Sequence, residues 1–249
     1  MAKGGARFAI DQTISVAGEA PVSLPGSGLV DPEAMRGRMQ IDLSQFPDLP
    51  SAFGADPGLE VVFERLTIYM RSAAFAAILP GAKRWLKLDV EKAGKTAGID
   101  LGALAQQGQD PTQTLRYLKA ASGAVERVGE EDVRGVKTTG YKATIDLRRY
   151  PELVPAKDRA PARAAIEQVI ELLGTDKAPV EVWIGEDGIV RRLKQKVSAP
   201  IPPGRERSTI EQQVDFFDFG TPVDVRLPPA DEVQDATDLV AAGLRGLTR

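Results

Sequence analysis

Residues 178–197 read APVEVWIGEDGIVRRLKQKV, and this stretch decides the fold. Two runs rich in β-branched residues flank Gly185–Gly188, a short link of turn-forming residues, and this arrangement predicts a β-hairpin. The first strand alternates, with Val180, Val182 and Ile184 on one face and Trp183 on the other.

The second strand of this hairpin divides in the same way. Its apolar residues are Ile189, Leu193 and Val197, and its cations are Arg192, Lys194 and Lys196. One apolar and one solvent-exposed face are typical of an antiparallel sheet with a single buried side. Most of the remaining chain repeats this unit, so the question is what the apolar side covers.

The composition narrows the class of protein. The 249 residues are 43% hydrophobic and 27% charged, as in ordinary globular proteins. No apolar run approaches the ~20 residues of a membrane-spanning helix. The net charge of −3, with scattered Lys and Arg, argues against nucleic acid as a partner.

Two residue types that carry much enzyme chemistry are absent. The sequence has no Cys and no His, which excludes thiol nucleophiles, Cys or His metal ligands and Ser-His-Asp triads. Asp146 with Glu181, or Asp215 with Asp218, could form an acid/base pair, but carboxylates at this density usually face solvent. We therefore predict no catalytic residue, no metal site, no cofactor and no enzyme.

Further strands follow along the chain. We expect strands at 6–18, 35–43, 59–63, 66–70 and 83–90, and at 21–28 a loop that can include a short strand running on to Val30. The apolar phase switches between Phe63 and Leu66, which requires a turn or bulge at Glu64–Arg65. Residues 124–150 predict two strands with a turn near Glu130–Asp132, and residues 207–220 one more.

Two helices interrupt the strands, and a short helix over residues 101–107 precedes the first of them. Asp110 and Pro111 form a helix start and Gly123 an end. The second helix runs over Pro161–Leu173, with an apolar face around Ala165. The sequence thus predicts an α+β fold: a single curved antiparallel sheet of about ten or eleven strands, a half-open barrel, around a few helices. Residues 1–235 form this domain and residues 236–249 a tail.

A family likeness is carried by pieces that recur in order over Asp110–Asp235. They include the Asp-Pro helix start, Thr138–Thr139 with Tyr141, the Trp183 hairpin, and Phe219–Gly220 ahead of the two prolines 228 and 229. In these pieces the chain resembles the actinobacterial LppX/LprAFG lipoproteins, whose fold is similar to that of the LolA/LolB lipoprotein carriers.

The resemblance implies a cell-envelope protein that binds lipids or lipid-modified molecules between sheet and helices. It also implies export and tethering to the membrane through a lipidated N-terminal Cys, which is absent from this sequence. The expected partners are a lipid, a glycolipid or an acylated protein, together with a membrane surface. We expect a monomer.

Candidate ligand contacts are the apolar residues that we expect on the inner face. An acyl chain gains about 0.8 kcal/mol per buried CH₂ there and needs no polar motif. The alternative is that these residues form an ordinary filled core. The set is Phe63, Leu66, Ile68, Met70, Leu86, Leu88, Leu115, Leu118, Ala165, Ile166, Val169, Leu173, Val182, Ile184 and Leu193.

Two loops carry further apolar side chains. They serve either as a cap over the core or as a lid at the barrel mouth, and their residues are Phe46, Leu49, Phe53, Phe75, Ile78 and Leu79. The leading hypothesis is a non-enzymatic envelope carrier that holds acyl chains in an apolar cavity. The alternative is an envelope protein-interaction or sensor module with the same fold and a filled core.

Overall fold

The computed structural model describes residues 4–45, 57–73, 81–96, 125–153, 159–200 and 207–247, together with the single residues 75, 79 and 156. The helices predicted at 101–107 and 110–123 lie outside these residues, as do candidate site residues Leu115 and Leu118 and loop residues Phe46, Leu49, Phe53 and Ile78.

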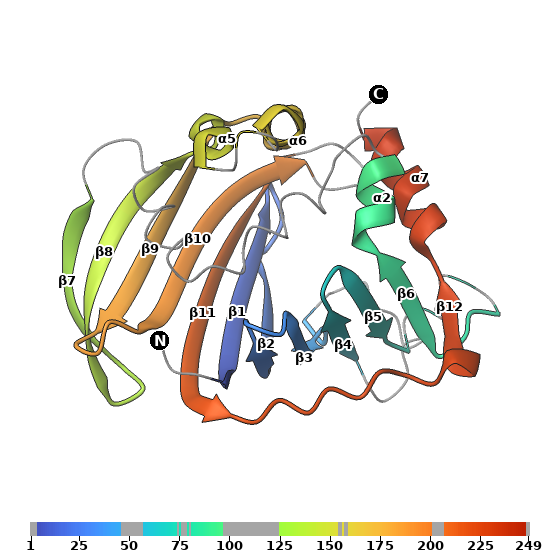
Figure 1. The fold of residues 1–249 in the computed structure, drawn as a ribbon, viewed down its shortest axis with the longest axis horizontal. Helices are drawn as coiled ribbons and strands as arrows, with labels where there is room; N and C mark the ends of the chain where they lie inside the picture. The colour runs from blue at the N-terminus through green and yellow to red at the C-terminus, as the bar shows by residue number, and fades with distance from the viewer. Residues whose placement is uncertain are drawn as a thin grey trace.

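One strongly curved sheet of twelve strands forms the body of the protein (Figure 1). Its order is β12-β6-β5-β4-β3-β2-β1-β11-β10-β9-β8-β7, and every pairing is antiparallel except β12 with β6. The predicted α+β fold with a single open sheet is confirmed. The strands are β1 (Gly5–Val16), β2 (Val22–Asp31), β3 (Arg36–Asp42), β4 (Gly58–Glu64), β5 (Thr67–Arg71), β6 (Trp85–Asp89), β7 (Glu126–Val133), β8 (Val136–Asp146), β9 (Lys177–Gly185), β10 (Val190–Pro200), β11 (Arg207–Thr221) and β12 (Val233–Asp235).

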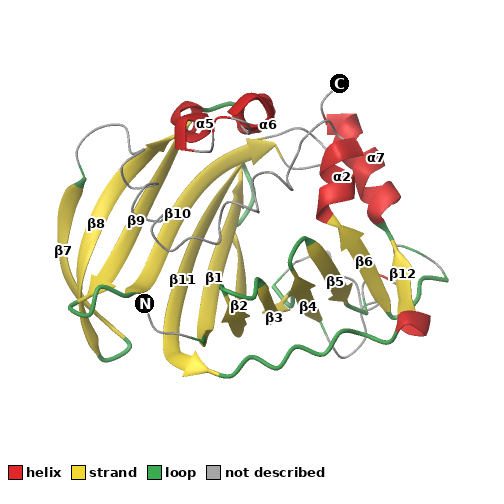
Figure 2. Cartoon of the chain, in the orientation of Figure 1, coloured by secondary structure: helices red, strands yellow, loops and turns green. Residues whose placement is uncertain are grey.

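The α-helices form two separate groups, both in the upper part of the view in Figure 2. One group follows β8, and α6 packs against α5 and β10; the other group, α2 and α7, lies beside β6. The helices are α2 (Val90–Thr96), α5 (Tyr150–Leu153), α6 (Arg159–Leu173) and α7 (Thr237–Leu247), with 3-10 turns η2 (Leu147–Arg149) and η4 (Ala230–Glu232). Helix α6 confirms the helix predicted at 161–173; Gly174 ends it, with a φ of 68°.

The 178–197 hairpin is confirmed as β9 and β10, with one correction to its register. Val190 pairs with Ile184 and Arg192 with Trp183, so Arg191 is an extra residue in a β-bulge. The bulge shifts the alternation by one residue. Val190, and not Ile189, therefore lies opposite Ile184.

Three other predicted boundaries were wrong. Residues 22–31 form the ten-residue strand β2, where we expected a loop with at most a short strand; Pro25 is tolerated because it lies just past the pairing with β3, which ends at Gly26. The β7–β8 turn lies at Arg134–Gly135, whose φ values of 52° and 82° fit a two-residue hairpin turn. Val133 consequently ends β7 and does not belong to β8.

The predicted turn between 64 and 65 is confirmed, since Arg65 has a φ of 53° between β4 and β5. Leu66 belongs to this turn and not to β5. Its carbonyl accepts a hydrogen bond of 2.8 Å from the Val90 backbone N–H, so Leu66 ties the turn to the start of α2.

A buried threonine joins the C-terminal helix to the sheet. Thr237 is fully buried, and its Oγ1 accepts a 2.9 Å hydrogen bond from the Asp89 backbone N–H. Asp89 in turn caps α2 by accepting from the Lys92 N–H, and Lys92 forms an ion pair of 3.0 Å with Asp238. The predicted tail is thus helix α7, held against α2.

Strand register separates the sheet into two faces. Directly opposed residues share a face. On what we call the polar face, Arg192 of β10 lies opposite Asp215 of β11, and its Nε and Nη2 donate to the Asp215 carboxylate at 2.6 and 2.8 Å. Glu131 of β7 also accepts from Arg192.

The same face holds aromatic rings beneath cations. The Lys194 Nζ lies 4.4 Å from the Trp183 ring centroid, and the Arg134 guanidinium 4.1 Å from that of Phe217. Trp183 is only 6% exposed and lies over Gly140 of β8, where a Cβ would come within 2.9 Å of its Nε1. The prediction that Trp183 faces away from the apolar side is confirmed.

Replacing Asp215 with Asn should lower the free energy of unfolding by about 2–4 kcal/mol at pH 7, because Arg192 stays largely buried without its main partner. Burial by itself raises the pKa of Asp215, but the hydrogen bonds and charge of Arg192 outweigh it and hold that pKa below its ordinary value. The ion pair stabilises the fold at neutral pH, and this contribution disappears as pH falls through the lowered pKa.

Urea unfolding of wild type and D215N at pH 7 and at about pH 2 measures this effect. The difference between them should shrink at the lower pH. Asp218→Asn is the matched control, because the Asp218–Arg7 pair is exposed on both sides and Asn tolerates the φ of 50° at this position. Equal losses in D215N and D218N would contradict the role of the buried pair.

Candidate functional site

The apolar face of the sheet carries a continuous row of side chains. From β8 to β4, each residue of this row lies opposite the next on the neighbouring strand. All of them are half-buried, so the row is neither packed away nor fully open to solvent. We call it the central row, and it comprises Tyr141, Val182, Leu193, Val214, Ile10, Gly26, Ile41 and Leu59.

Two further rows continue the apolar face toward β6. One runs through Phe216, Phe8, Gly28, Met39, Val61, Met70 and Leu86, and the other through Val30, Gly37, Phe63, Ile68 and Leu88. The β4–β6 part of the predicted set therefore shares one face: Phe63, Ile68, Met70, Leu86 and Leu88. Val182 and Leu193 share the central row, and Ile184 lies on the same face of β9.

Sequence reasoning missed the middle of this face. Phe8 and Ile10 of β1 and Val214 and Phe216 of β11 lie between the two predicted groups. The signal was present in the alternation of Phe8 with Ile10. It was not used because the pairing of β1 with β11 joins residues about 200 positions apart, which no local pattern reveals.

Glycines let large side chains lie flat against β2 and β3. A Cβ on Gly28 would come within 2.7 Å of the Phe8 Cζ, and one on Gly37 within 2.6 Å of the Phe63 Cζ. Gly26 gives the same room to Ile10, at 2.9 Å. Because the rings rest on the backbone instead of standing above it, the apolar face is shallow here.

The apolar face is buried unevenly: Phe8, Val61 and Leu86 are buried, whereas the central row is half-buried. Its packed centre consists of Ala143 and Val180, with Ile145, Val182 and Leu193 half-buried around them. Helix α6 packs against β10 and presents Ala162, Ala165 and Ile166, all buried. Val169 and Leu173 are half-buried on the same helix.

One polar side chain of α6 departs from the expected pattern. Gln168 lies on the side of the helix where helical spacing predicts polar residues, yet it is half-buried, and its Oε1 is shielded from solvent with no hydrogen-bond partner among the described residues. It lies on the flank of the helix that turns toward Ala165, three residues earlier. The polar side of α6 is narrower than the sequence indicates.

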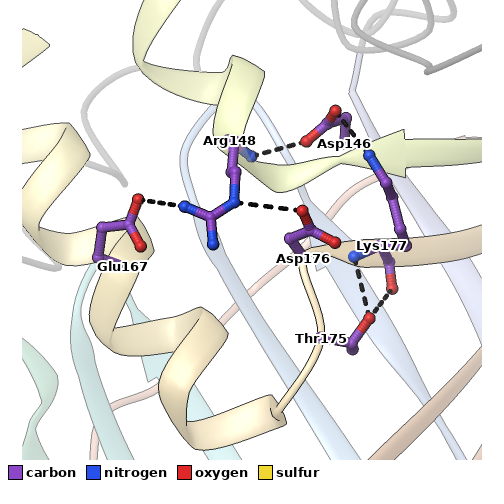
Figure 3. A network of polar contacts seen from close by, with 6 residues as sticks. All are labelled: Asp146, Arg148, Glu167, Thr175, Asp176 and Lys177. Carbon is purple, nitrogen blue, oxygen red and sulfur yellow. Dashed lines mark hydrogen bonds and ion pairs between the residues drawn. The ribbon is translucent and has the colours of Figure 1, made fainter.

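An exposed ionic network attaches α6 to the sheet (Figure 3). Arg148 of η2 extends between α6 and the start of β9, with its Nη1 2.6 Å from Glu167 and its Nε 3.2 Å from Asp176. Next to it, Asp146 accepts from the Arg148 backbone N–H and from Lys177 Nζ. All these pairs are substantially exposed on at least one side.

The carboxylates considered as acid/base pairs are engaged elsewhere. A hydrogen bond from Lys177 lowers the pKa of Asp146, and Arg192 lowers that of Asp215, so both are ionised acceptors at neutral pH. Asp218 pairs with Arg7. Within the described ranges, no group of three or more acidic residues is arranged to hold a metal ion.

Of the predicted lid residues, the structure describes only Phe75 and Leu79. Phe75 and Leu79 of the second apolar loop are half-buried, and Phe75 lines a hollow beside Arg71. Among the described helices, none is long and apolar enough to cross a membrane.

No protein-family profile matches this chain. It is 26% identical to an uncharacterized 31.2 kDa protein of Streptomyces griseus over 192 aligned residues. These aligned residues make up 76% of this chain and 60% of the relative. It is 25% identical to a candidate lipoprotein of Streptomyces coelicolor over 167 aligned residues, and the alignment covers 65% of this chain and 46% of the relative. The chain thus spans about half of the curated relatives it matches.

The solved structures of two mycobacterial proteins, LppX and LprF, are also similar to this chain. The lipoprotein LppX of Mycobacterium tuberculosis is 14% identical, with 89% of each chain covered and a TM-score of 0.47. LprF of Mycobacterium bovis is 13% identical, with 92% and 91% covered and a TM-score of 0.43. The resemblance to LppX/LprAFG lipoproteins predicted from the sequence is confirmed as a similarity to these proteins.

Replacing Arg148 with Ala should loosen α6 while barely changing global stability. Its ion pairs are exposed, so we expect a loss below about 1 kcal/mol in urea unfolding. Amide hydrogen exchange across 159–177 should nevertheless accelerate, since the helix loses its attachment to η2 and β9. Lys196→Ala, which breaks the exposed pair with Glu211, is the control. Unchanged exchange in α6 would show that the network does not hold the helix.

Proposed function

We propose that this chain is a non-enzymatic carrier that holds the acyl chains of a lipid or lipidated molecule on the apolar face of its sheet. The observation that carries the proposal is the central row. It crosses eight strands, about 35 Å at the spacing of neighbouring strands, and its side chains stay half-buried. An extended hydrocarbon fits such a surface.

The energetics favour an apolar chain over other ligands. Each CH₂ placed against these side chains gains about 0.8 kcal/mol, so a single long acyl chain supplies substantial affinity without polar contacts. Ile10, Phe8 and Phe63 lie flat over Gly26, Gly28 and Gly37, so the surface that they offer to the chain is apolar and shallow. The proposed contacts are Ile10, Phe63, Ile68, Met70, Leu86, Leu88, Ala165, Ile166, Val169, Leu173, Val182, Ile184, Leu193 and Val214.

The cellular setting is part of the same proposal. One curated relative is described as a candidate lipoprotein, and LppX is described as a lipoprotein. By analogy, the chain acts as a monomer in the cell envelope next to a membrane surface, and its cargo is a lipid, a glycolipid or an acylated protein. We assign Leu79 to a lid at the mouth of this site, whereas Phe75 lines the hollow beside Arg71.

Native mass spectrometry of the purified protein, followed by lipid extraction, tests the proposal directly. A protein with bound lipid, or one that takes up a fluorescent fatty acid, supports it. A protein that is empty and takes up neither fatty acids nor glycolipids contradicts it and favours an interaction module with a filled core.

Replacing Ala165 with Trp should reduce uptake of a fluorescent fatty acid at least tenfold, because Ala165 is 1% exposed on the side of α6 that turns inward. Ala164→Trp is the matched control, since Ala164 is exposed on the same helix and its substitution should leave uptake unchanged. Equal uptake by the two variants would exclude a cargo site under α6.

Leu193→Gln provides a second probe for the case in which A165W fails to fold. Leu193 is half-buried in the central row, so a polar side chain of similar size costs limited stability but interrupts the apolar surface. We expect weaker fatty-acid binding with an unchanged circular dichroism spectrum. Wild-type affinity in L193Q would remove the central row from the site.

A further inference from the structure

The opposite, polar face of the sheet has hollows of its own over β1–β6. One, of about 380 Å³, is lined by residues of β1, β2, β3, β4 and β11, among them Arg7, Leu29 and Arg38. Another, of about 310 Å³, includes Arg71, Lys83 and Arg84. Both are also lined by Gln40 and Glu60, which are directly paired across β3 and β4. They therefore form one continuous depression, which we call the polar-face groove.

The groove is basic in a protein that is acidic overall. Its side chains include five cations and one acid, whereas the whole chain has a net charge of −3. The acid, Glu60, is paired with Arg71. The cations are Arg7, Arg38, Arg71, Lys83 and Arg84.

Two of these cations have no ionic partner in the part of the chain that the structure describes. Arg38 and Lys83 are exposed and form no ion pair with described residues. Arg7 and Arg84 make only loose, exposed pairs, 3.5 Å to Asp218 and 3.8 Å to Glu232. An incoming anion would therefore meet cations that are unpaired or weakly held.

The centre of the groove is more ordered. Arg71 lies 5.2 Å from the centroid of the Trp85 ring and is also held by Glu60. Both contacts fix the guanidinium plane while its side chain remains about one-third exposed. A fixed planar guanidinium suits two-point recognition of phosphate oxygens, and Gln40, which lines the same hollow, adds amide donors.

We propose that the polar-face groove binds a phosphate-bearing anion, at a site separate from the apolar face. Arg38 and Lys83 supply the unpaired charge, Arg71 the oriented donor, and Gln40 the neutral donor between the two hollows. The phosphate could be that of a membrane lipid headgroup or that of a soluble phosphate ester. The two sources share this chemistry and are separated by the experiment below.

The test uses the full chain and two probes, sodium tripolyphosphate in solution and vesicles of phosphatidylglycerol mixed with phosphatidylcholine. We expect binding of at least one probe at 20 mM salt, weakened severalfold or more at 300 mM because exposed charges are screened. Vesicles of pure phosphatidylcholine, which carry no net charge, are the control for binding through the apolar face. Tripolyphosphate binding identifies a soluble ligand, and binding to anionic vesicles alone identifies a headgroup.

The double variant Arg38→Glu/Lys83→Glu should weaken that binding about tenfold or more. The matched control is Lys137→Glu/Arg163→Glu, which makes the same change in net charge at exposed positions of β8 and α6. If charge reversal disturbs folding, Arg38→Gln/Lys83→Gln replaces it, with a smaller loss expected.

Failure of this proposal is distinguishable from failure of the carrier proposal. The R38E/K83E variant should take up fluorescent fatty acid like wild type, because its changes lie on the other face of the sheet. Absence of salt-sensitive binding to both probes, or an equal loss in the K137E/R163E control, would overturn the polar-face groove as a phosphate site.

Discussion

The two-residue alternation of β-strands is the constraint on which the rest of this structure depends. In a single sheet of twelve strands, every side chain lies on one face or the other. Because paired residues of neighbouring strands share a face, the register determines which side chains lie together. Here the choice is consistent, with an apolar central row from Tyr141 to Leu59 and the buried Arg192–Asp215 pair on the opposite face. A slip of one residue in any strand would place charges among the apolar side chains.

The two faces of this large open sheet are covered in different ways. The apolar face is closed in part by α6, whose buried side chains are small and whose attachment through Arg148 is exposed to solvent. The polar face is closed by its own side chains, because cations cover Trp183, Phe217 and Trp85. The stable, self-covered face and the loosely covered face are thus formed by the same strands.

The sequence was sufficient to predict elements that local patterns define. The 178–197 hairpin, the turn at Arg65 and helix α6 follow from turn formers, phase changes and helical spacing, and all are observed. It was insufficient where one residue breaks the pattern: the bulge at Arg191 moved Val190 into the place of Ile189, and Pro25 concealed strand β2. The middle of the candidate site was missed for a different reason, because Ile10 meets Val214 only through pairing across the whole chain.

That distant pairing has a consequence for how the protein reaches its native state. Strands β1 to β6 form an uninterrupted series in which each strand pairs with the next, but both borders of the series are completed by C-terminal segments, β11 beside β1 and β12 beside β6. Residues 222–232 run along the edge of the sheet between these two strands (Figure 1). Because loop closure over such a distance is entropically costly and slow, both borders of this series stay unpaired until β11 and β12 have been made and have reached them. This sheet therefore cannot be completed strand by strand in chain order.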